Sequence, residues 1–336
     1  MATRFTRNDF KPEGIFWHFE FTSKCTLRCP SCSRTVPRVD YEPRDLSRDA
    51  IEGFFTDEVL RQTRKVIYSG NLGDPIYHRE LPAIVRFFRA AGIHQAVVTN
   101  GSWRGPRWWG ELADAMAPSD VIIFSIDGLR DTNAIYRINS NWDGIMEAVG
   151  VCRGRVKLHW KFIAFAHHEH QIEEARALSK ELGFDRFMVV VSWRAKNENM
   201  APKRATLEKI ARGADLRPLD GIEATPELRP KCLNGDHWFI SHEGRFFPCC
   251  MMAAIRHHME PTVFHRRRER FDITRHGLGE MLASEAFAEF VDTLNDPAKT
   301  YQVCREKCAS TGTTNRTIKL DDAAPAGAAR AAARRP

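Results

Sequence analysis

Short apolar stretches alternate with amphipathic stretches along the first two thirds of the chain. The short stretches are rich in branched and aromatic side chains, which is typical of strands buried on both faces. Between them, apolar side chains recur with the period of a helix, as in Ile51, Phe54, Phe55 and Val59. This alternation predicts an α/β fold with a parallel sheet and helical crossovers. The predicted strands cover residues 15–21, 65–69, 95–99, 121–126, 156–164 and 186–191.

The pattern changes in the last third of the chain. Residues 195–230 lose the alternation and contain four prolines, which indicates a polar connection between two domains. Two short apolar runs then flank Glu243 and Gly244, and this tight-turn signal predicts a hairpin that brings Cys232 and Cys249 close together. One helix is expected around residues 278–294.

These changes predict five segments. Residues 1–14 form an N-terminal extension, 15–194 the α/β domain, 195–230 the linker, 231–320 a small second α+β domain, and 321–336 a disordered tail.

Composition narrows the class of protein. The 336 residues are 43% hydrophobic and 28% charged, and no run is long enough to span a membrane. The first residues lack the apolar core of a secretory signal, so we expect a cytoplasmic protein. A net charge of +7 permits anionic substrates but falls short of the charge typical of nucleic-acid-binding proteins.

Eight of the nine cysteines fall into two groups. In a reducing compartment such groups indicate metal binding rather than disulfides. Three thiolates in one loop suit an iron–sulfur cluster with one open iron, whereas zinc normally takes four ligands. The ninth, Cys152, is expected to be a buried apolar residue. The first group is Cys25, Cys29 and Cys32, and the second is Cys232, Cys249, Cys250, Cys304 and Cys308.

The first group resembles the signature of the radical S-adenosylmethionine (SAM) superfamily, a C-x3-C-x2-C motif after the first strand of a partial (β/α)6 TIM-like barrel. The motif carries Pro30-Ser31 where many members have an aromatic residue. The resemblance implies that Cys25, Cys29 and Cys32 hold a SAM-binding [4Fe–4S] cluster.

Three further strand ends are similar to SAM-contacting motifs of that family. A glycine-rich turn with Gly70, Gly73 and Asp74 follows the second strand, with Asp74 in place of the usual glutamate. The resemblance implies that this turn holds the methionine amino group of SAM. Contacts to the ribose or carboxylate of SAM are implied for the ends of the third and fourth strands, at Thr99, Asn100, Ser125 and Asp127.

The second group resembles the SPASM and Twitch auxiliary-cluster domains, because Cys232, Gly244 and Cys249 have their C-x(9–15)-G-x4-C spacing. The resemblance favours the shorter Twitch form, with a second [4Fe–4S] cluster on Cys232, Cys249, Cys304 and Cys308. A structural zinc ion is the alternative, and Cys250 is the alternative to Cys249.

Other polar residues carry weaker signals. Strand alternation places His18 and Glu20 on one face and Lys161 on the same face as His159, so either pair could line a barrel lumen. The tract 167–170 is interpreted as a solvated loop, and the arginine-rich run 266–270 as a solvated face.

The resemblance implies an activity. One electron from the reduced cluster would cleave SAM at the open iron, and the resulting 5′-deoxyadenosyl radical would abstract hydrogen from a peptide or small-molecule substrate. Net oxidation or cross-linking is expected, with a flavodoxin- or ferredoxin-type electron donor. The alternatives are an RNA-modifying enzyme that grips RNA with the run 266–270, and a non-enzymatic iron–sulfur or zinc protein. No catalytic acid or base can be named from the sequence.

Overall fold

The strands form one sheet that runs through both halves of the chain. The computed structural model describes residues 4–35, 42–192, 200–211, 228–253, 261–308 and 315–319. Its strands are β1 (Ile15–Phe19), β2 (Thr63–Tyr68), β3 (His94–Thr99), β4 (Val121–Ser125), β5 (Lys157–Ile163), β6 (Arg186–Ser192), β7 (Trp238–Ile240), β8 (Phe246–Phe247) and β9 (Asn315–Lys319).

Six neighbouring strands, β1 to β6, are parallel and follow their order in the chain. The predicted α/β architecture with helical crossovers is thereby confirmed. The C-terminal strands extend this sheet at both edges: β7 pairs with β1 in parallel, β8 pairs with β7, and β9 pairs with β6 in antiparallel orientation. Strand β1 therefore lies between β2 and β7.

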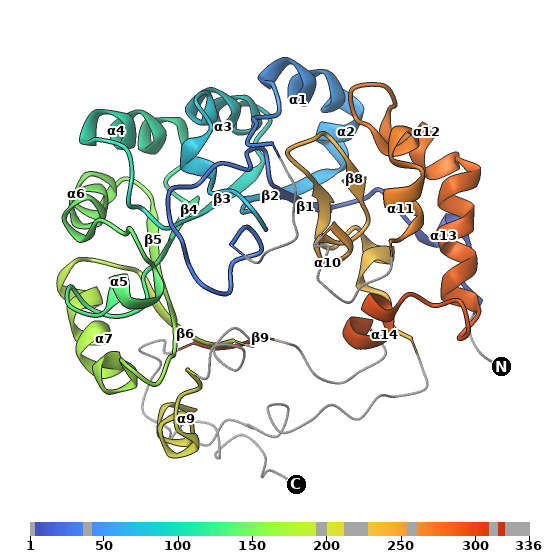
Figure 1. Cartoon of the computed structure of the whole chain (residues 1–336). Coiled ribbons are helices and arrows are strands. Elements are labelled where there is room, and N and C mark those ends of the chain that lie inside the picture. The colour runs from blue at the N-terminus through green and yellow to red at the C-terminus, as the bar shows by residue number, and fades with distance from the viewer. Residues whose placement is uncertain are drawn as a thin grey trace, which may run out of the picture.

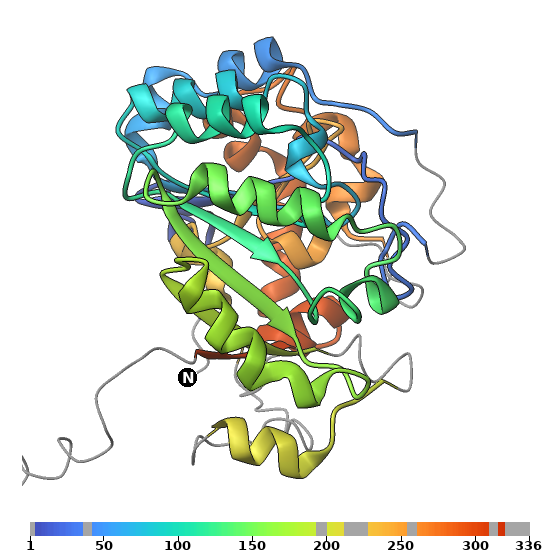
Figure 2. The same ribbon diagram turned by 90° about the vertical axis from the view of Figure 1, so that its left-hand side faces the viewer.

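The helices of the first half connect the parallel strands. They form an arc on the outer side of the sheet, whereas the helices from α10 to α13 stand on the side of β7 and β8 (Figure 1). Figure 2 shows α6 and α7 lying along the outside of the green strands. The helices are α1 (Arg48–Phe54), α2 (Asp57–Gln62), α3 (Leu81–Ala90), α4 (Pro106–Ala115), α5 (Asn133–Tyr136), α6 (Trp142–Cys152), α7 (Ile172–Glu181), α9 (Arg204–Ala211), α10 (Cys250–Ala253), α11 (Val263–Arg266), α12 (Leu278–Ala283), α13 (Glu285–Asn295) and α14 (Gln302–Cys308).

Strand alternation separates an apolar outer face from a more polar inner face. Trp17 and Phe19 of β1 are buried, and the Trp17 ring packs edge-on against Phe54 and Phe55 at 5.9 and 5.4 Å between centroids. His18 lies between them in the strand and points to the opposite face, where it is only half-buried. The inner face can thus present polar groups. Among the described residues, no helix combines the length and apolar character needed to cross a bilayer.

The structure corrects three local predictions. The helix expected over 278–294 is broken at Ser284, whose hydroxyl accepts a hydrogen bond from Phe287 N and so begins a new helix, α13. The connection 195–230 contains helix α9 in its described part. In the tract 167–170, His168 is fully buried against Phe162 instead of solvated. The expected disordered tail lies outside the described residues.

The turn after β2 packs directly on the chain that follows β1. A Cβ atom at Gly73 would overlap the backbone carbonyl of Thr22, which cannot move as a flexible side chain can. Gly73 is therefore required by the close approach of two backbone segments.

Replacing Gly73 with alanine should destabilise the fold by about 1–3 kcal/mol, the usual cost of overpacking. The matched control is Gly53→Ala on α1, because Gly53 is exposed and nothing lies within 4 Å of its added Cβ. That change should stabilise the helix by about 0.5–1 kcal/mol. Urea unfolding of both variants measures the difference, and equal midpoints would contradict it.

Candidate functional site

The first thiol group lies on the loop that follows β1. Cys25, Cys29 and Cys32 are all half-buried, and Cys32 N donates to Cys29 O at 3.0 Å. The Arg34 side chain closes the loop, since its Nη1 donates to Cys25 O at 2.9 Å. Burial raises the pKa of Cys25, and it raises that of Cys29 to about 11. The loop thus gathers three thiols, and the charged forms of two of them, Cys25 and Cys29, are poorly solvated.

The ends of β2 and β3 meet this loop at Cys25. Asn100 Nδ2 lies 3.6 Å from Cys25 Sγ and 2.6 Å from Asp74 Oδ2, which also accepts from Asn100 N. Asp74 Oδ1 accepts from Ile76 N at 3.2 Å, and burial raises the Asp74 pKa to about 6. The Thr99 side chain also hydrogen-bonds Asp74. The structure therefore brings Asp74, Thr99 and Asn100 together beside the first thiol group.

The end of β4 lies on the other side of that group. Asp127 is fully buried; its Oδ1 accepts from Ile163 N at 2.7 Å, and its Oδ2 lies 2.8 Å from Arg137 Nε. Arg137 is close enough to Cys29 to counter the rise in its pKa. Asp127 thus holds a buried cation near the thiols. Ser125 is buried next to Lys161 of β5.

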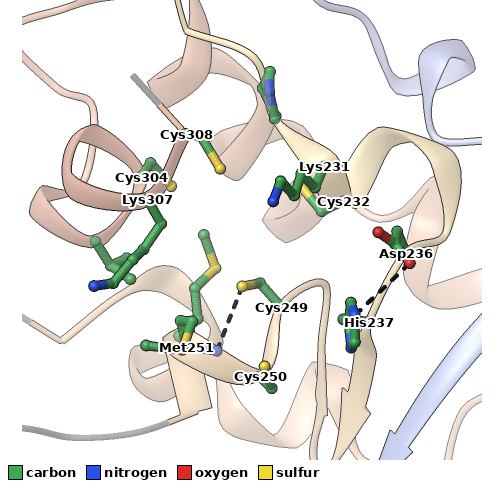
Figure 3. A pocket seen from close by; sticks show the side chains of 13 residues that line it. Lys231, Cys232, Asp236, His237, Cys249, Cys250, Met251, Cys304, Lys307 and Cys308 are labelled. Atoms are coloured by element: carbon green, nitrogen blue, oxygen red, sulfur yellow. Dashed lines mark hydrogen bonds and ion pairs between the residues drawn. The ribbon is translucent and has the colours of Figure 1, made fainter. Parts of the chain in front are cut away.

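The second thiol group lines a separate cavity of about 250 Å³ between η5 (Lys231–Asn234), α10 and α14 (Figure 3). Cys232 lies just before β7, where its carbonyl accepts from Trp238 Nε1 at 2.8 Å. In Figure 3, the sulfur atoms of Cys249 and Cys308 both point into the cavity. The thiols that line it are Cys232, Cys249, Cys250, Cys304 and Cys308.

The pKa values of the adjacent thiols Cys249 and Cys250 shift in opposite directions. Cys249 accepts hydrogen bonds from the Cys250 thiol and from backbone N–H groups, including that of Met251 at 3.4 Å, and its pKa falls to about 7. The same thiol–thiol hydrogen bond, with burial, raises the pKa of Cys250. Cys249 is therefore the thiol of the pair that carries negative charge most readily, as a metal ligand must.

Comparison with known proteins decides the family. The profile of the radical SAM superfamily matches residues 19–190, and that of the SPASM iron-sulfur cluster-binding domain matches residues 232–309. The chain belongs to the radical SAM superfamily. It is an enzyme whose cofactors are SAM and [4Fe–4S] clusters, including an auxiliary cluster in the SPASM region. The alternative of a non-enzymatic metal protein is set aside.

Two curated proteins are similar to this radical SAM chain, over very different shares of its length. A PqqA peptide cyclase of Xanthomonas campestris pv. campestris is 26% identical over 303 residues, which cover 82% of this chain and 75% of the relative. A tungsten-containing aldehyde ferredoxin oxidoreductase cofactor-modifying protein of Pyrococcus furiosus is 29% identical over 114 residues. That match spans 34% of this chain and 31% of the relative.

Solved structures share the fold. Streptococcus suis SuiB bound to precursor peptide SuiA has a TM-score of 0.59 at 12% identity, over 89% of this chain and 77% of that chain. Native anSMEcpe with bound AdoMet and Kp18Cys peptide has a TM-score of 0.50 at 12% identity, over 88% and 89%. At this identity the likeness extends to the fold alone.

The donor set of this radical SAM chain fits iron–sulfur clusters. Five thiols line the second cavity, and four thiolates suffice for one [4Fe–4S] cluster. Lys231 and Lys307 line the second cavity and would offset the negative charge of a thiolate-bound cluster.

The arginine-rich run 266–270 is largely neutralised by neighbouring carboxylates. Arg266 and Arg267 both pair with Glu289, at 2.8 and 3.2 Å, and Arg270 pairs with Glu280 at 3.2 Å. These pairs favour the solvated-face interpretation over an RNA grip.

Sequence reasoning missed one group near the first thiols. Arg137 lies twelve residues after the end of β4 and belongs to no motif of the sequence analysis. Only its buried ion pair with Asp127 places it at the site.

In the metal-free protein, Cys249 should be alkylated by iodoacetamide before Cys250 and Cys152, with a rate that rises through pH 7. The reason is that the thiolate reacts, and the pKa of Cys249 is about 7. Cys152 is the control, since burial raises its pKa to about 12. Mass spectrometry of timed samples measures both, and Cys152 labelling at the rate of Cys249 would contradict the assignment.

Proposed function

We propose that this chain is a radical SAM enzyme that abstracts hydrogen from a peptide and leaves it oxidised or cross-linked. The observation that carries the proposal is that two thiol groups lie near β1, one after its carboxyl end and one beside the amino end of its parallel partner β7. The proposed ligands of the SAM-binding cluster are Cys25, Cys29 and Cys32, and those of the auxiliary cluster are Cys232, Cys249, Cys304 and Cys308.

When bound, the reduced cluster and SAM supply a 5′-deoxyadenosyl radical that removes a hydrogen atom from the substrate. The chain's own residues bind and orient. We propose that the Gly70, Gly73 and Asp74 turn, with Thr99, Asn100 and Ser125, contacts SAM. We propose that Asp127 does not contact SAM itself but holds Arg137, because the Asp127 side chain is fully buried and pairs with Arg137 and with Ile163 N.

The inner face of the sheet provides the proposed substrate space. His18 lies there near Lys161 and His237, and burial lowers its pKa to about 4. Since Ser69 O can only accept, His18 Nε2 donates the 2.8 Å hydrogen bond between them, which leaves His18 Nδ1 as an acceptor. His237 also lines the auxiliary cavity. These residues give the proposed substrate polar partners between the two centres.

A peptide substrate is supported by the PqqA peptide cyclase, which matches most of this chain. It is further supported by the fold shared with SuiB, whose structure contains a precursor peptide. Net oxidation is proposed because the substrate radical becomes an oxidised product when it loses one proton and one electron. A second redox centre can accept that electron.

Replacing Cys25, Cys29 and Cys32 together with alanine should abolish 5′-deoxyadenosine formation from SAM under dithionite. Replacing Cys232 and Cys304 with alanine should leave that cleavage in place, because these thiols line the separate auxiliary cavity. Cys152→Ala is the control and should behave as wild type. Chromatography of the products measures each variant, and 5′-deoxyadenosine from the triple variant would refute the assignment.

A further inference from the structure

The carboxylate of Glu20 lies buried where the chain leaves β1, and its side chain is only 4% exposed. Its Oε1 accepts hydrogen bonds from two successive backbone amides of the turn after β2, Leu72 N and Gly73 N, the second at 3.2 Å. A charged acceptor makes such bonds stronger than a neutral one. Glu20 therefore fixes the backbone of the turn that the proposed function assigns to SAM.

The turn is shaped to receive this carboxylate. A Cβ atom at Gly70 would lie 2.6 Å from Glu20 Oε1, closer than real Cβ atoms approach. Glycine at this position lets the carboxylate enter the turn. The sequence placed Glu20 on a face that could touch substrate, but the structure directs one of its oxygens to the turn.

The other oxygen faces the C-terminal region. Glu20 Oε2 lies 3.7 Å from His242 Nδ1, and the His242 side chain is 8% exposed. His242 stands in the turn between β7 and β8, and Glu20 N donates to Ile240 O of β7 at 2.9 Å. Strand β8 leads within two residues to Cys249. One carboxylate thus contacts both the turn after β2 and the hairpin that ends at the auxiliary cavity.

We propose that Glu20 is a positioning residue for SAM, and that its contact with His242 makes SAM affinity depend on the β7–β8 hairpin. The inference rests on the proposed function in one respect, the contact of the Gly70–Asp74 turn with SAM. It assigns Glu20 no contact with the reacting atoms. Glu20 acts through the amides of Leu72 and Gly73.

The test is SAM binding to the anaerobically reconstituted enzyme, by equilibrium dialysis without reductant, for Glu20→Ala, Glu20→Gln, His242→Ala and the Glu20→Gln/His242→Ala double variant. Glu20→Ala should raise the Kd for SAM at least about tenfold, because two amides lose a charged acceptor. Glu20→Gln should restore part of the affinity, since its amide oxygen still accepts.

The double variant tests the contact itself. His242→Ala should weaken SAM binding in the wild-type background and add little in the Glu20→Gln background, where the charge it faces is gone. Additive losses would overturn the proposed link to the hairpin. This double-mutant cycle does not use Glu20→Ala, so it still tests the link between Glu20 and the hairpin if that variant does not fold.

Two further readouts separate positioning from a general loss of structure. In Glu20→Ala, hydrogen exchange of the Leu72 and Gly73 amides should accelerate without SAM, and the KM for SAM should rise more than kcat falls. The matched control is Glu280→Gln, which removes the charge from another Glu–His pair, with 2.7 Å between His276 Nδ1 and Glu280 Oε1. This control should bind SAM as wild type does.

The outcomes distinguish this inference from the proposed function. A wild-type enzyme that neither binds nor cleaves SAM would overturn both. A wild type that cleaves SAM, with a Glu20→Ala variant that matches it in Kd, KM and amide exchange, would overturn the role of Glu20 alone.

Discussion

The hydrogen bonding of β1 on both of its edges is the constraint on which the site depends. On one side β1 pairs with β2, and on the other with β7, both in parallel. The carboxyl ends of parallel strands meet at one edge of a sheet, so the Cys25 loop lies beside the turn after β2. The pairing with β7 places the auxiliary cavity near the amino end of β1, opposite the Cys25 loop, because Cys232 and Cys249 lie at the open end of the β7–β8 hairpin.

Burial sets the chemistry of both centres. It raises the pKa of Cys25, Cys29, Cys232 and Cys304, so without a metal these thiols keep their protons. Metal binding must then release protons, and its free energy also offsets the cost of placing charges out of water. Arg137, held by Asp127, and the two lysines of the auxiliary cavity supply the positive charge that such centres need.

The periodic parts of the fold could be predicted from the sequence, and the long-range pairings could not. Each of the six parallel strands begins and ends within two residues of its predicted bounds, since local alternation determines a strand. The pairing of β7 with β1 and of β9 with β6 joins segments far apart in the chain. The break at Ser284 was missed because the apolar period continues across it, while a single serine caps the second helix.

The candidate site divides in the same way. The cysteine groups and the glycine-rich turn have spacings that a sequence displays directly. The contacts of Glu20 and Arg137 depend on tertiary structure, and neither residue belongs to a spaced motif. His168 was assigned to a solvated loop because histidines and a glutamate surround it in sequence, whereas aromatic rings surround it in space.

The most direct test of the two-centre account is the iron and sulfide content of the anaerobically reconstituted protein. Two [4Fe–4S] clusters correspond to about eight irons and about eight sulfides per chain. The account gives about four of each after loss of Cys25, Cys29 and Cys32, and about four after loss of Cys232 and Cys304. Full iron content in either variant, or zinc in place of iron in the wild type, would contradict it.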